Sequence, residues 1–264
     1  MMGPLNTAFS LSFTFAMSEA AIASSILDSS GESTRRLARF WGRRLCRTCG
    51  VEVTSRGGEG VAWDEPLIVM ASHQSYLDIP ALYAVLPQPF GMLAKQELFR
   101  LPVFNLAMRG LRCIPIDRDN LRQSLASLRQ AAEQIRAGNS IVVFPEGTRS
   151  TDGSLQELKT GPFYLAEMAR VPIVPVGIRG TNRALAKGAL FVRRARVEVR
   201  IGQPILPARR GPAERDRLRG AVHAALSELL GEIVSRKEGT NGLAAIDSPP
   251  TGPIAIGYGE ELTQ

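Results

Sequence analysis

The chain has 264 residues, of which 44% are hydrophobic, and its formal net charge at pH 7 is +7. The apolar fraction excludes wholesale disorder, and the length favours one large α/β domain over two small ones. The positive charge predicts an anionic partner, either nucleic acid, a phosphorylated substrate or an acidic membrane. Nucleic acid is the weakest of these three, because aromatic residues are sparse and no long basic block occurs.

The N-terminal region predicts helices that attach to a membrane without crossing it. The apolar stretch from Leu5 to Met17 is shorter than the roughly 20 residues that a membrane span needs, and no basic region precedes it as in a secretory signal. Thr34 is a candidate N-cap for the helix that follows. From Arg35 to Leu45, cations mix with Phe40 and Trp41, which is typical of an interfacial helix that dips its aromatic side chains into lipid. The alternative is an ordinary amphipathic helix docked on the core.

A short apolar run at residues 68–71 predicts a buried strand that ends close to His73, with Asp78 five residues further on. On a regular helix these two side chains would lie on different faces, so they meet only if the chain bends between them. Pro80 favours such a bend and predicts that the next helix begins near Ile79. A carboxylate held against one imidazole nitrogen leaves the other nitrogen as a general base. The alternative makes His73 a hydrogen-bonded loop residue and Asp78 a helix N-cap.

Apolar runs and helical periodicity alternate along the rest of the chain. Strands are expected at residues 51–53, 68–71, 90–94, 113–118, 141–144, 173–178 and 196–201, and helices at 80–85, 101–108, 121–135, 162–170 and from 212 onward. Pro115 indicates an edge strand or a bulge, and Asn120 is expected to cap the helix that follows it. The alternation predicts an α/β fold with a mixed, largely parallel sheet flanked by helices and with functional groups at strand ends.

Three segments are expected: membrane-associating amphipathic helices at 1–50, the α/β domain at 51–236, and a loose tail at 237–264 that is rich in Gly, Pro and Ser. The second histidine, His223, lies beside the apolar stripe of the last helix, which indicates a structural role. The chain has three cysteines, and this number fits a reducing compartment. Their one C-x-x-C pair lacks the partners of a zinc site and the setting of a thioredoxin-like motif, which indicates that its spacing is coincidental.

Charged residues follow three more of the predicted strands. Lys95 follows the 90–94 strand, Arg118 ends the next strand, and Glu146 and Arg149 follow the one after that. Cations gathered at one sheet edge would form an anion pocket, because arginine holds phosphate through two parallel hydrogen bonds. Each charge taken alone is better explained as a solvated loop residue. The site is predicted because several strands are each followed directly by charged residues.

Four blocks of the sequence, in this order, resemble those of the glycerolipid acyltransferase family, best known for 1-acyl-sn-glycerol-3-phosphate acyltransferases. They are His73 to Asp78, Gly110 to Arg118, Phe144 to Ser150 and Val171 to Val176. Lys95 matches a further family lysine, and the resemblance covers roughly residues 35–205. Two positions depart from the family pattern, since Ser72 stands where asparagine is frequent and Thr160 where a second lysine is common.

The resemblance implies that His73 deprotonates the sn-2 hydroxyl of 1-acyl-sn-glycerol 3-phosphate, that Asp78 orients His73, and that the hydroxyl attacks an acyl thioester to give phosphatidic acid. The donor is acyl-CoA or acyl carrier protein, and neither a bound cofactor nor a metal is expected. The substrate-binding residues that the resemblance implies are Lys95, Arg118, Glu146, Gly147, Thr148 and Arg149. The expected location is the cytoplasmic face of a membrane, in a peripheral or monotopic arrangement. The alternatives are acylation of another lysolipid, such as lyso-ornithine lipid, and a non-catalytic lipid-binding protein.

Overall fold

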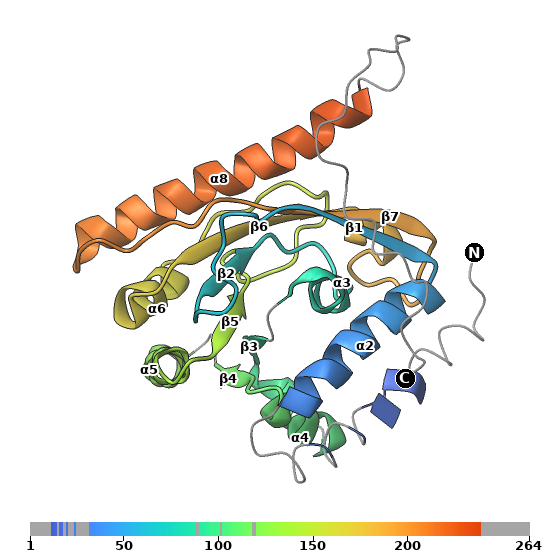
Figure 1. The fold of residues 1–264 in the computed structure, drawn as a ribbon, viewed down its shortest axis with the longest axis horizontal. Helices are drawn as coiled ribbons and strands as arrows, with labels where there is room; N and C mark the ends of the chain where they lie inside the picture. The colour runs from blue at the N-terminus through green and yellow to red at the C-terminus, as the bar shows by residue number, and fades with distance from the viewer. Residues whose placement is uncertain are drawn as a thin grey trace.

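A computed structural model describes residues 12–14, 16–17, 20, 24, 32–87, 90–100, 102–117 and 120–238. Its strands form one seven-stranded sheet in the order β1-β7-β6-β2-β5-β3-β4 (Figure 1). The strands are β1 (Val51–Gly57), β2 (Ile68–Ala71), β3 (Phe90–Lys95), β4 (Ile114–Ile116), β5 (Ser140–Val143), β6 (Ile173–Arg179) and β7 (Ala195–Ile201). All neighbouring strands pair in parallel except β6 and β7, which are antiparallel. The predicted mixed, largely parallel α/β sheet is therefore confirmed.

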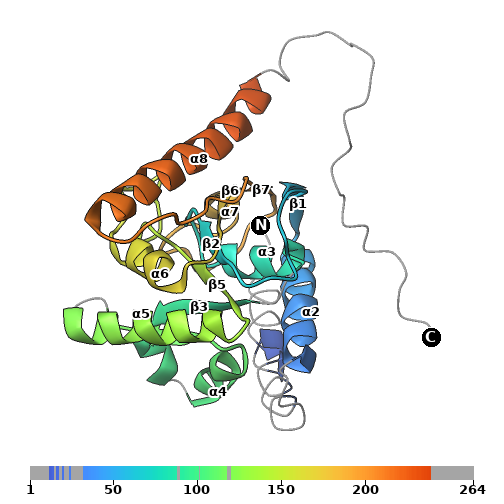
Figure 2. The same ribbon diagram turned by 60° about the vertical axis from the view of Figure 1, so that its left-hand side comes forward.

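Helices cover both faces of this sheet. They are α2 (Glu32–Thr48), α3 (Asp78–Val85), the 3-10 helix η1 (Gln96–Arg100), α4 (Pro102–Gly110), α5 (Leu121–Arg136), α6 (Gly161–Ala169), α7 (Thr181–Ala184) and α8 (Pro212–Glu238). Figures 1 and 2 show α2 and α3 together on one side of the sheet, and α5, α6 and α8 on the other. Asn120 caps α5 as predicted, because its side-chain oxygen accepts a hydrogen bond from the Gln123 backbone N–H. β4, which contains Pro115, is an edge strand.

The central strand β2 explains why its sequence shows a continuous apolar run. Val69 and Ala71 belong to the core beneath α2 and α3. Ile68 and Met70 belong to the second core, beneath α5, α6 and α8. Successive side chains of a strand point to opposite faces, so a strand covered by helices on both sides must be apolar at every position.

Helix α2 lies against the domain, and two expectations for this region are wrong. The helix already begins at Glu32, so the fully buried Thr34 is inside it and cannot be its N-cap. The Trp41 ring packs edge-on against Tyr83, with the ring centroids 6.0 Å apart, and therefore does not extend from the surface. Of the two aromatic residues expected to enter lipid, only Phe40 is largely exposed, at 49%.

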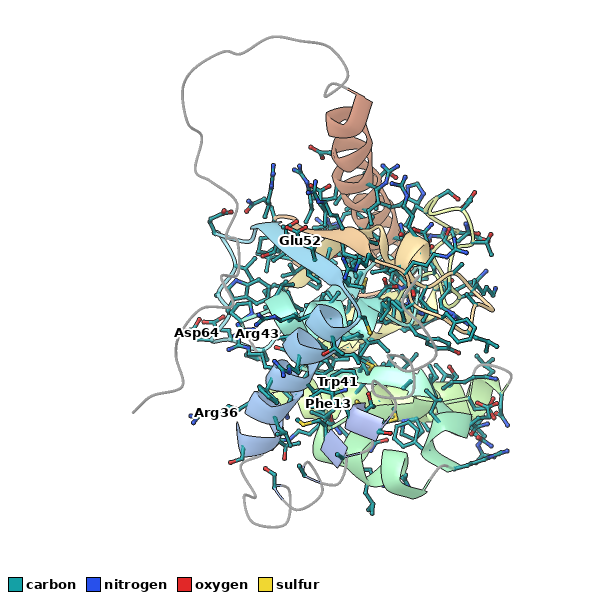
Figure 3. All side chains as sticks on the ribbon, turned by 90° about the vertical axis from the view of Figure 1, so that its right-hand side faces the viewer. Phe13, Arg36, Trp41, Arg43, Glu52 and Asp64 are labelled. Carbon is teal, nitrogen blue, oxygen red and sulfur yellow. The ribbon has the colours of Figure 1, made fainter. Side chains whose placement is uncertain are left out.

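Gly42 permits the close contact between α2 and α3. A Cβ atom at this position would lie 2.7 Å from the Pro80 carbonyl oxygen and 2.8 Å from Tyr83 Cβ. On the other side of the same helix, Figure 3 shows Arg36 directed outward from α2. The ordinary alternative for this helix, docking on the core, therefore accounts for its inner face.

None of the described helices is both long enough and apolar enough to cross a membrane. The predicted apolar stretch from Leu5 to Met17 falls largely outside the described residues, as does most of the predicted tail at 237–264. The last helix, α8, extends to Glu238.

Candidate active site

The chain bends directly after β2, and the bend brings His73 and Asp78 into contact. His73 Nδ1 lies 2.7 Å from Asp78 Oδ2. The Asp78 side chain is completely buried, whereas the His73 side chain retains 14% of its exposure. Helix α3 begins at Asp78, one residue earlier than Pro80 suggests from the sequence, with Leu77 in the N-cap position.

Four donors converge on the Asp78 carboxylate. Oδ2 accepts hydrogen bonds from His73 Nδ1 and from the backbone N–H groups of Gln74 and Ser75, at 2.7, 2.7 and 2.9 Å. Oδ1 accepts a hydrogen bond of 2.5 Å from Thr181 Oγ1. A carboxylate only accepts hydrogen bonds, so Nδ1 of His73 carries the ring hydrogen and Nε2 keeps its lone pair. This is the tautomer that a general base needs.

Thr181 is a site residue that sequence reasoning missed. It opens α7 and is completely buried, although it lies 103 positions after Asp78. Gly180 precedes it with φ of 96°, a left-handed conformation that turns the chain from β6 toward the Asp78 carboxylate. The sequence signal that could have identified it is the pair of polar residues Thr181 and Asn182, which follow a predicted apolar strand after one glycine.

The segment after β5 supports His73 from behind. The Phe144 ring stacks on the imidazole, with centroids 3.9 Å apart and an interplanar angle of 16°. Glu146 is only 1% exposed, and its two oxygens accept backbone hydrogen bonds from His73 at 2.7 Å and Gln156 at 2.9 Å. Burial raises the pKa of Glu146 to about 7. The carboxylate thus lies behind the His73 main chain, with both of its oxygens already engaged by backbone donors.

The predicted cations differ in how they are placed. Arg149 lies in the loop after β5, with its guanidinium 3.8 Å from the centroid of the Tyr76 ring, and this tyrosine is 58% exposed. Lys95 ends β3 and pairs with Glu97 Oε1 at 3.1 Å. Arg118 lies outside the described residues. β2, β3 and β5 are parallel neighbours, so their carboxyl ends bring Lys95 and Arg149 to the same edge as His73.

The third predicted block is tied to the first by a main-chain contact. The Ser150 backbone N–H donates a hydrogen bond of 2.7 Å to the His73 carbonyl oxygen. Gly147 adopts φ of 71°, which suits a residue without a Cβ, and Thr148 is exposed. The loop after β5 therefore turns tightly around the His73 segment.

An apolar cavity of about 610 Å³ opens beside this turn, beneath α2 and α3. Tyr76 and Leu77 contribute to its wall next to the His73–Asp78 pair. Trp41, Met92 and Met108 line other parts of it. The volume lies within the range of small-molecule sites, and the apolar wall suits a hydrocarbon chain.

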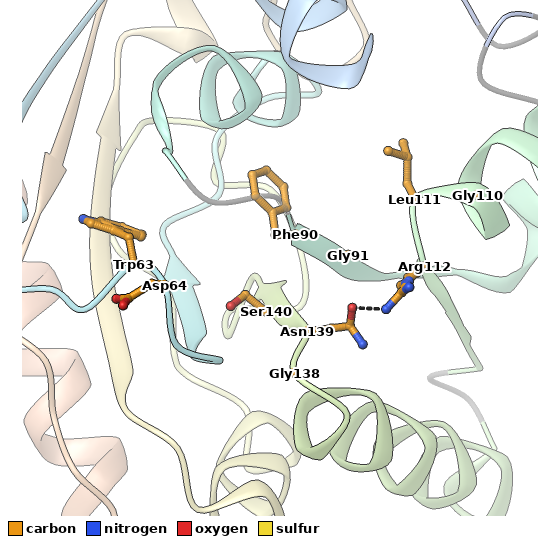
Figure 4. Close-up of a pocket in the computed structure, with 10 residues that line it drawn as sticks. All are labelled: Trp63, Asp64, Phe90, Gly91, Gly110, Leu111, Arg112, Gly138, Asn139 and Ser140. Carbon is orange, nitrogen blue, oxygen red and sulfur yellow. Dashed lines mark hydrogen bonds between the residues drawn. The ribbon is translucent and has the colours of Figure 1, made fainter. Parts of the chain in front are cut away.

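A smaller cavity of about 250 Å³ lies at the other end of the strands (Figure 4). Phe90 and Ser140, which begin β3 and β5, line it. In the same cavity Arg112 Nη1 donates a hydrogen bond to Asn139 Oδ1, drawn as a dashed line in Figure 4. The amino ends of the strands are at the edge opposite His73, so this cavity is not part of the site.

Among the described residues, neither a metal-binding cluster nor a reactive thiol is found near His73, at the carboxyl ends of the strands. No group of three or more metal-binding side chains is found among the described residues. Cys46 and Cys49 are buried, and burial raises the pKa of Cys46 to about 12. A thiolate nucleophile is therefore not available from Cys46.

Comparison with known proteins points to one family. The acyltransferase family model matches residues 52–179. A chloroplastic 1-acyl-sn-glycerol-3-phosphate acyltransferase from Brassica napus is 35% identical over 143 residues, which are 54% of this chain and 41% of that protein. The alpha form of that enzyme from Ovis aries is 31% identical over 185 residues, 68% of this chain and 64% of the relative. The chain thus spans about two-fifths to two-thirds of the length of these curated relatives.

The fold gives the same result. The crystal structure of the 1-acyl-sn-glycerophosphate acyltransferase PlsC from Thermotoga maritima is similar to this structure, with a TM-score of 0.76 and 26% sequence identity. The similarity covers 87% of this chain and 93% of that one. Together, the four ordered sequence blocks, the matched family model and this shared architecture show that the chain belongs to the glycerolipid acyltransferase family.

Proposed function

We propose that the protein transfers a fatty acyl group from an acyl thioester to the sn-2 hydroxyl of 1-acyl-sn-glycerol 3-phosphate, producing phosphatidic acid. The observation that carries this proposal is the contact of His73 with the buried Asp78 carboxylate, beside an apolar cavity of about 610 Å³. Nε2 of His73 is unengaged by any described residue. The printed names of the relatives, which are 1-acyl-sn-glycerol-3-phosphate acyltransferases, support the same acceptor.

In the proposed reaction, His73 Nε2 takes the proton of the acceptor hydroxyl while the hydroxyl oxygen forms a bond to the thioester carbonyl carbon. The tetrahedral intermediate then collapses, the carbon–sulfur bond breaks, and the imidazolium returns its proton to the departing thiolate. Asp78 stabilises the imidazolium and, with Phe144, fixes the plane of the ring. A general base supplies about 10²–10⁴ of the rate, so positioning of both substrates must supply much of the rest.

Arg149, together with Lys95 and Arg118, is proposed to bind the phosphate of the acceptor. Stacking on the Tyr76 ring fixes the plane of the Arg149 guanidinium and leaves its edge for bidentate hydrogen bonds to phosphate oxygens. Gly147 and Thr148 belong to the tight loop that carries this arginine. Glu146 then acts indirectly, by holding the His73 main chain.

The apolar cavity is proposed to hold the hydrocarbon chain of a substrate. Each buried methylene of such a chain contributes about 0.8 kcal/mol, which is binding energy available for orienting the reacting ester end. In this arrangement the α/β domain at 51–236 carries the chemistry, and helices of the region 1–50 cover the cavity. We place the protein on the cytoplasmic face of a membrane, where a lysophospholipid acceptor in the bilayer and an acyl thioester donor can both reach the site.

An acceptor and donor panel with purified protein tests the proposal. The acceptors are 1-acyl-sn-glycerol 3-phosphate, lysophosphatidylcholine and lyso-ornithine lipid, each with acyl-CoA and with acyl carrier protein as donor, and the products are identified by mass spectrometry. Phosphatidic acid is the expected major product, and His73→Ala serves as the inactive control. The assignment would be refuted if only lyso-ornithine lipid were acylated, or if no acceptor in the panel led to consumption of the thioester.

A further inference from the structure

The connection between α7 and β7 presents an exposed apolar tip. We call residues 185–194 the α7–β7 loop; within it, Leu190 is 78% exposed and Phe191 is 45% exposed. Every residue from Ala186 to Phe191 is exposed. Single exposed leucines are ordinary, but two adjacent large apolar side chains at the tip of a loop suggest an interaction surface.

Hydrogen bonds hold this loop in place at its base. The Arg193 backbone N–H donates to the Ala184 carbonyl at 2.7 Å, and the Ala189 N–H donates to the Ala186 carbonyl at 3.0 Å. Ser75 Oγ donates a 2.7 Å hydrogen bond to the Leu185 carbonyl oxygen. Ser75 belongs to the turn between His73 and Asp78, so the loop is anchored directly to the catalytic turn.

Positive charge surrounds the apolar tip. The four exposed cations at or beside the tip are Arg183, Lys187, Arg193 and Arg194, and none of them forms an ion pair with a described residue. The sequence contains no acidic residue between Glu167 and Glu198. A surface with this charge favours an anionic partner.

The same loop forms part of the wall of the apolar cavity. Leu185, Leu190 and Val192 line the cavity together with Tyr76, the tyrosine beneath the Arg149 guanidinium. Leu190 is therefore both a cavity-lining residue and the most exposed large apolar side chain of the described structure. A hydrocarbon chain that left a bilayer at this loop would meet the cavity without crossing water.

We propose that the α7–β7 loop docks the protein on an anionic lipid surface. Leu190 and Phe191 enter the acyl-chain region, and the four cations remain at the level of the headgroups, as in other interfacial segments. An acidic protein would match the cations but would not explain the adjacent apolar tip and cavity wall. The proposal rests on the proposed function and adds the surface by which the protein contacts the membrane. Vesicle binding is measured without acyl transfer, so the two can fail separately.

Vesicle co-sedimentation of the full chain tests this surface. The vesicles contain phosphatidylcholine alone or phosphatidylcholine with phosphatidylglycerol, and the variants are Phe191→Ser and the double variant R193Q/R194Q. Leu190 is left intact because it lines the cavity. The matched controls are Leu206→Ser and R209Q/R210Q, since Leu206, Arg209 and Arg210 repeat the spacing of Leu190, Arg193 and Arg194 after the opposite end of β7 and are exposed.

We expect R193Q/R194Q to weaken binding to anionic vesicles about 25-fold, at roughly five-fold per cation, and to reduce its salt dependence. We expect Phe191→Ser to weaken binding to both kinds of vesicle. Circular dichroism melting of each variant verifies that the fold is retained. The proposal is overturned if the loop variants bind vesicles like the wild type, or if they lose no more affinity than the two controls.

Two further outcomes separate this proposal from the proposed function. Loss of acyl carrier protein binding by R193Q/R194Q, with vesicle binding unchanged, would overturn lipid docking and leave the enzymatic assignment standing. A wild-type protein that acylates no acceptor, but loses vesicle binding through the loop variants, would refute the enzymatic assignment alone. In detergent micelles, where no bilayer is present, Phe191→Ser is expected to acylate at the wild-type rate.

Discussion

Thr181 Oγ1 donates a 2.5 Å hydrogen bond to Asp78 Oδ1 and thereby joins residues 103 positions apart. The other oxygen of the same carboxylate accepts the His73 ring N–H and two backbone N–H groups. All of these donors belong to the turn after β2 except Thr181, which follows the carboxyl end of β6 at the same edge of the sheet. Its hydroxyl therefore fixes the carboxylate against rotation about its own axis.

Removing this hydroxyl is expected to impair the chemical step. Thr181→Val preserves the shape of the side chain but leaves a buried carboxylate oxygen without its donor, which costs about 1–3 kcal/mol. We expect kcat to fall about ten-fold or more, with KM for the acceptor nearly unchanged. Thr181→Ser restores the hydroxyl and should recover most of kcat; an unrescued serine variant would indicate a packing role instead.

His73→Ala is expected to reduce turnover by about 10²–10⁴ or more without unfolding the protein. The imidazole lies at the surface end of the site and its removal leaves both cores intact. Initial rates with 1-acyl-sn-glycerol 3-phosphate and far-UV circular dichroism measure the two effects. Substantial residual turnover would count against a general-base role.

Glu146 is expected to make stability depend on pH. Its pKa is raised from 4.5 to about 7 by burial, so the folded state binds a proton more tightly than the unfolded state does. The contribution is complete below about pH 4.5, and the free energy of unfolding falls as the pH rises toward 7, by at most about 3 kcal/mol. Chemical denaturation at several pH values should show this slope.

Glu146→Gln is the matched variant for that measurement. Glutamine cannot ionise, so the part of the slope due to this residue should disappear between about pH 4.5 and 7. The amide nitrogen cannot accept from a backbone N–H, so the variant should also lose about 1–3 kcal/mol of stability at low pH. A variant with the same pH slope as the wild type would contradict the raised pKa.

Arg149→Ala is expected to act mainly on substrate binding. The arginine stacks on Tyr76 and is proposed to hold the acceptor phosphate, so its loss should raise KM for a phosphorylated acceptor about ten-fold while kcat changes little. Arg149→Lys keeps the charge but not the bidentate fork, and should give an intermediate KM. An unchanged KM in both variants would remove Arg149 from the phosphate site.

Gly42→Ala tests the contact between α2 and α3. Alanine favours a helix over glycine by about 1 kcal/mol, but its Cβ would lie 2.7 Å from the Pro80 carbonyl oxygen. We expect the steric cost of about 1–3 kcal/mol to prevail and Tm to fall. Gly220→Ala in α8, where the new Cβ would meet nothing within 4 Å apart from the neighbouring backbone of its own helix, should raise Tm instead.

The sheet could be predicted from the sequence because strands buried on both faces leave continuous apolar runs, as β2 does. The sequence predicts a contact between His73 and Asp78 only if the chain bends between them. The structure has this bend, and Pro80 lies just after it in the first turn of α3. The residues after β6 mark Thr181 as a candidate, but its contact with Asp78 could not be predicted, because that contact depends on strand order and on the pairing of β6, which no local pattern encodes. Trp41 was expected in lipid because an amphipathic helix has the same periodicity whether it covers a core or a bilayer.

The antiparallel arrangement of β6 and β7 has a further consequence for how this enzyme family can diversify. The chain from Gly180 to Arg194 leaves β6 and enters β7 at one edge of the sheet, so it never travels to the opposite edge. Insertions or deletions in this single connection would change the brace on Asp78 and the proposed lipid-contacting tip simultaneously. Natural variation in its length is therefore expected to be limited to residues 186–188, which are exposed and precede the tip.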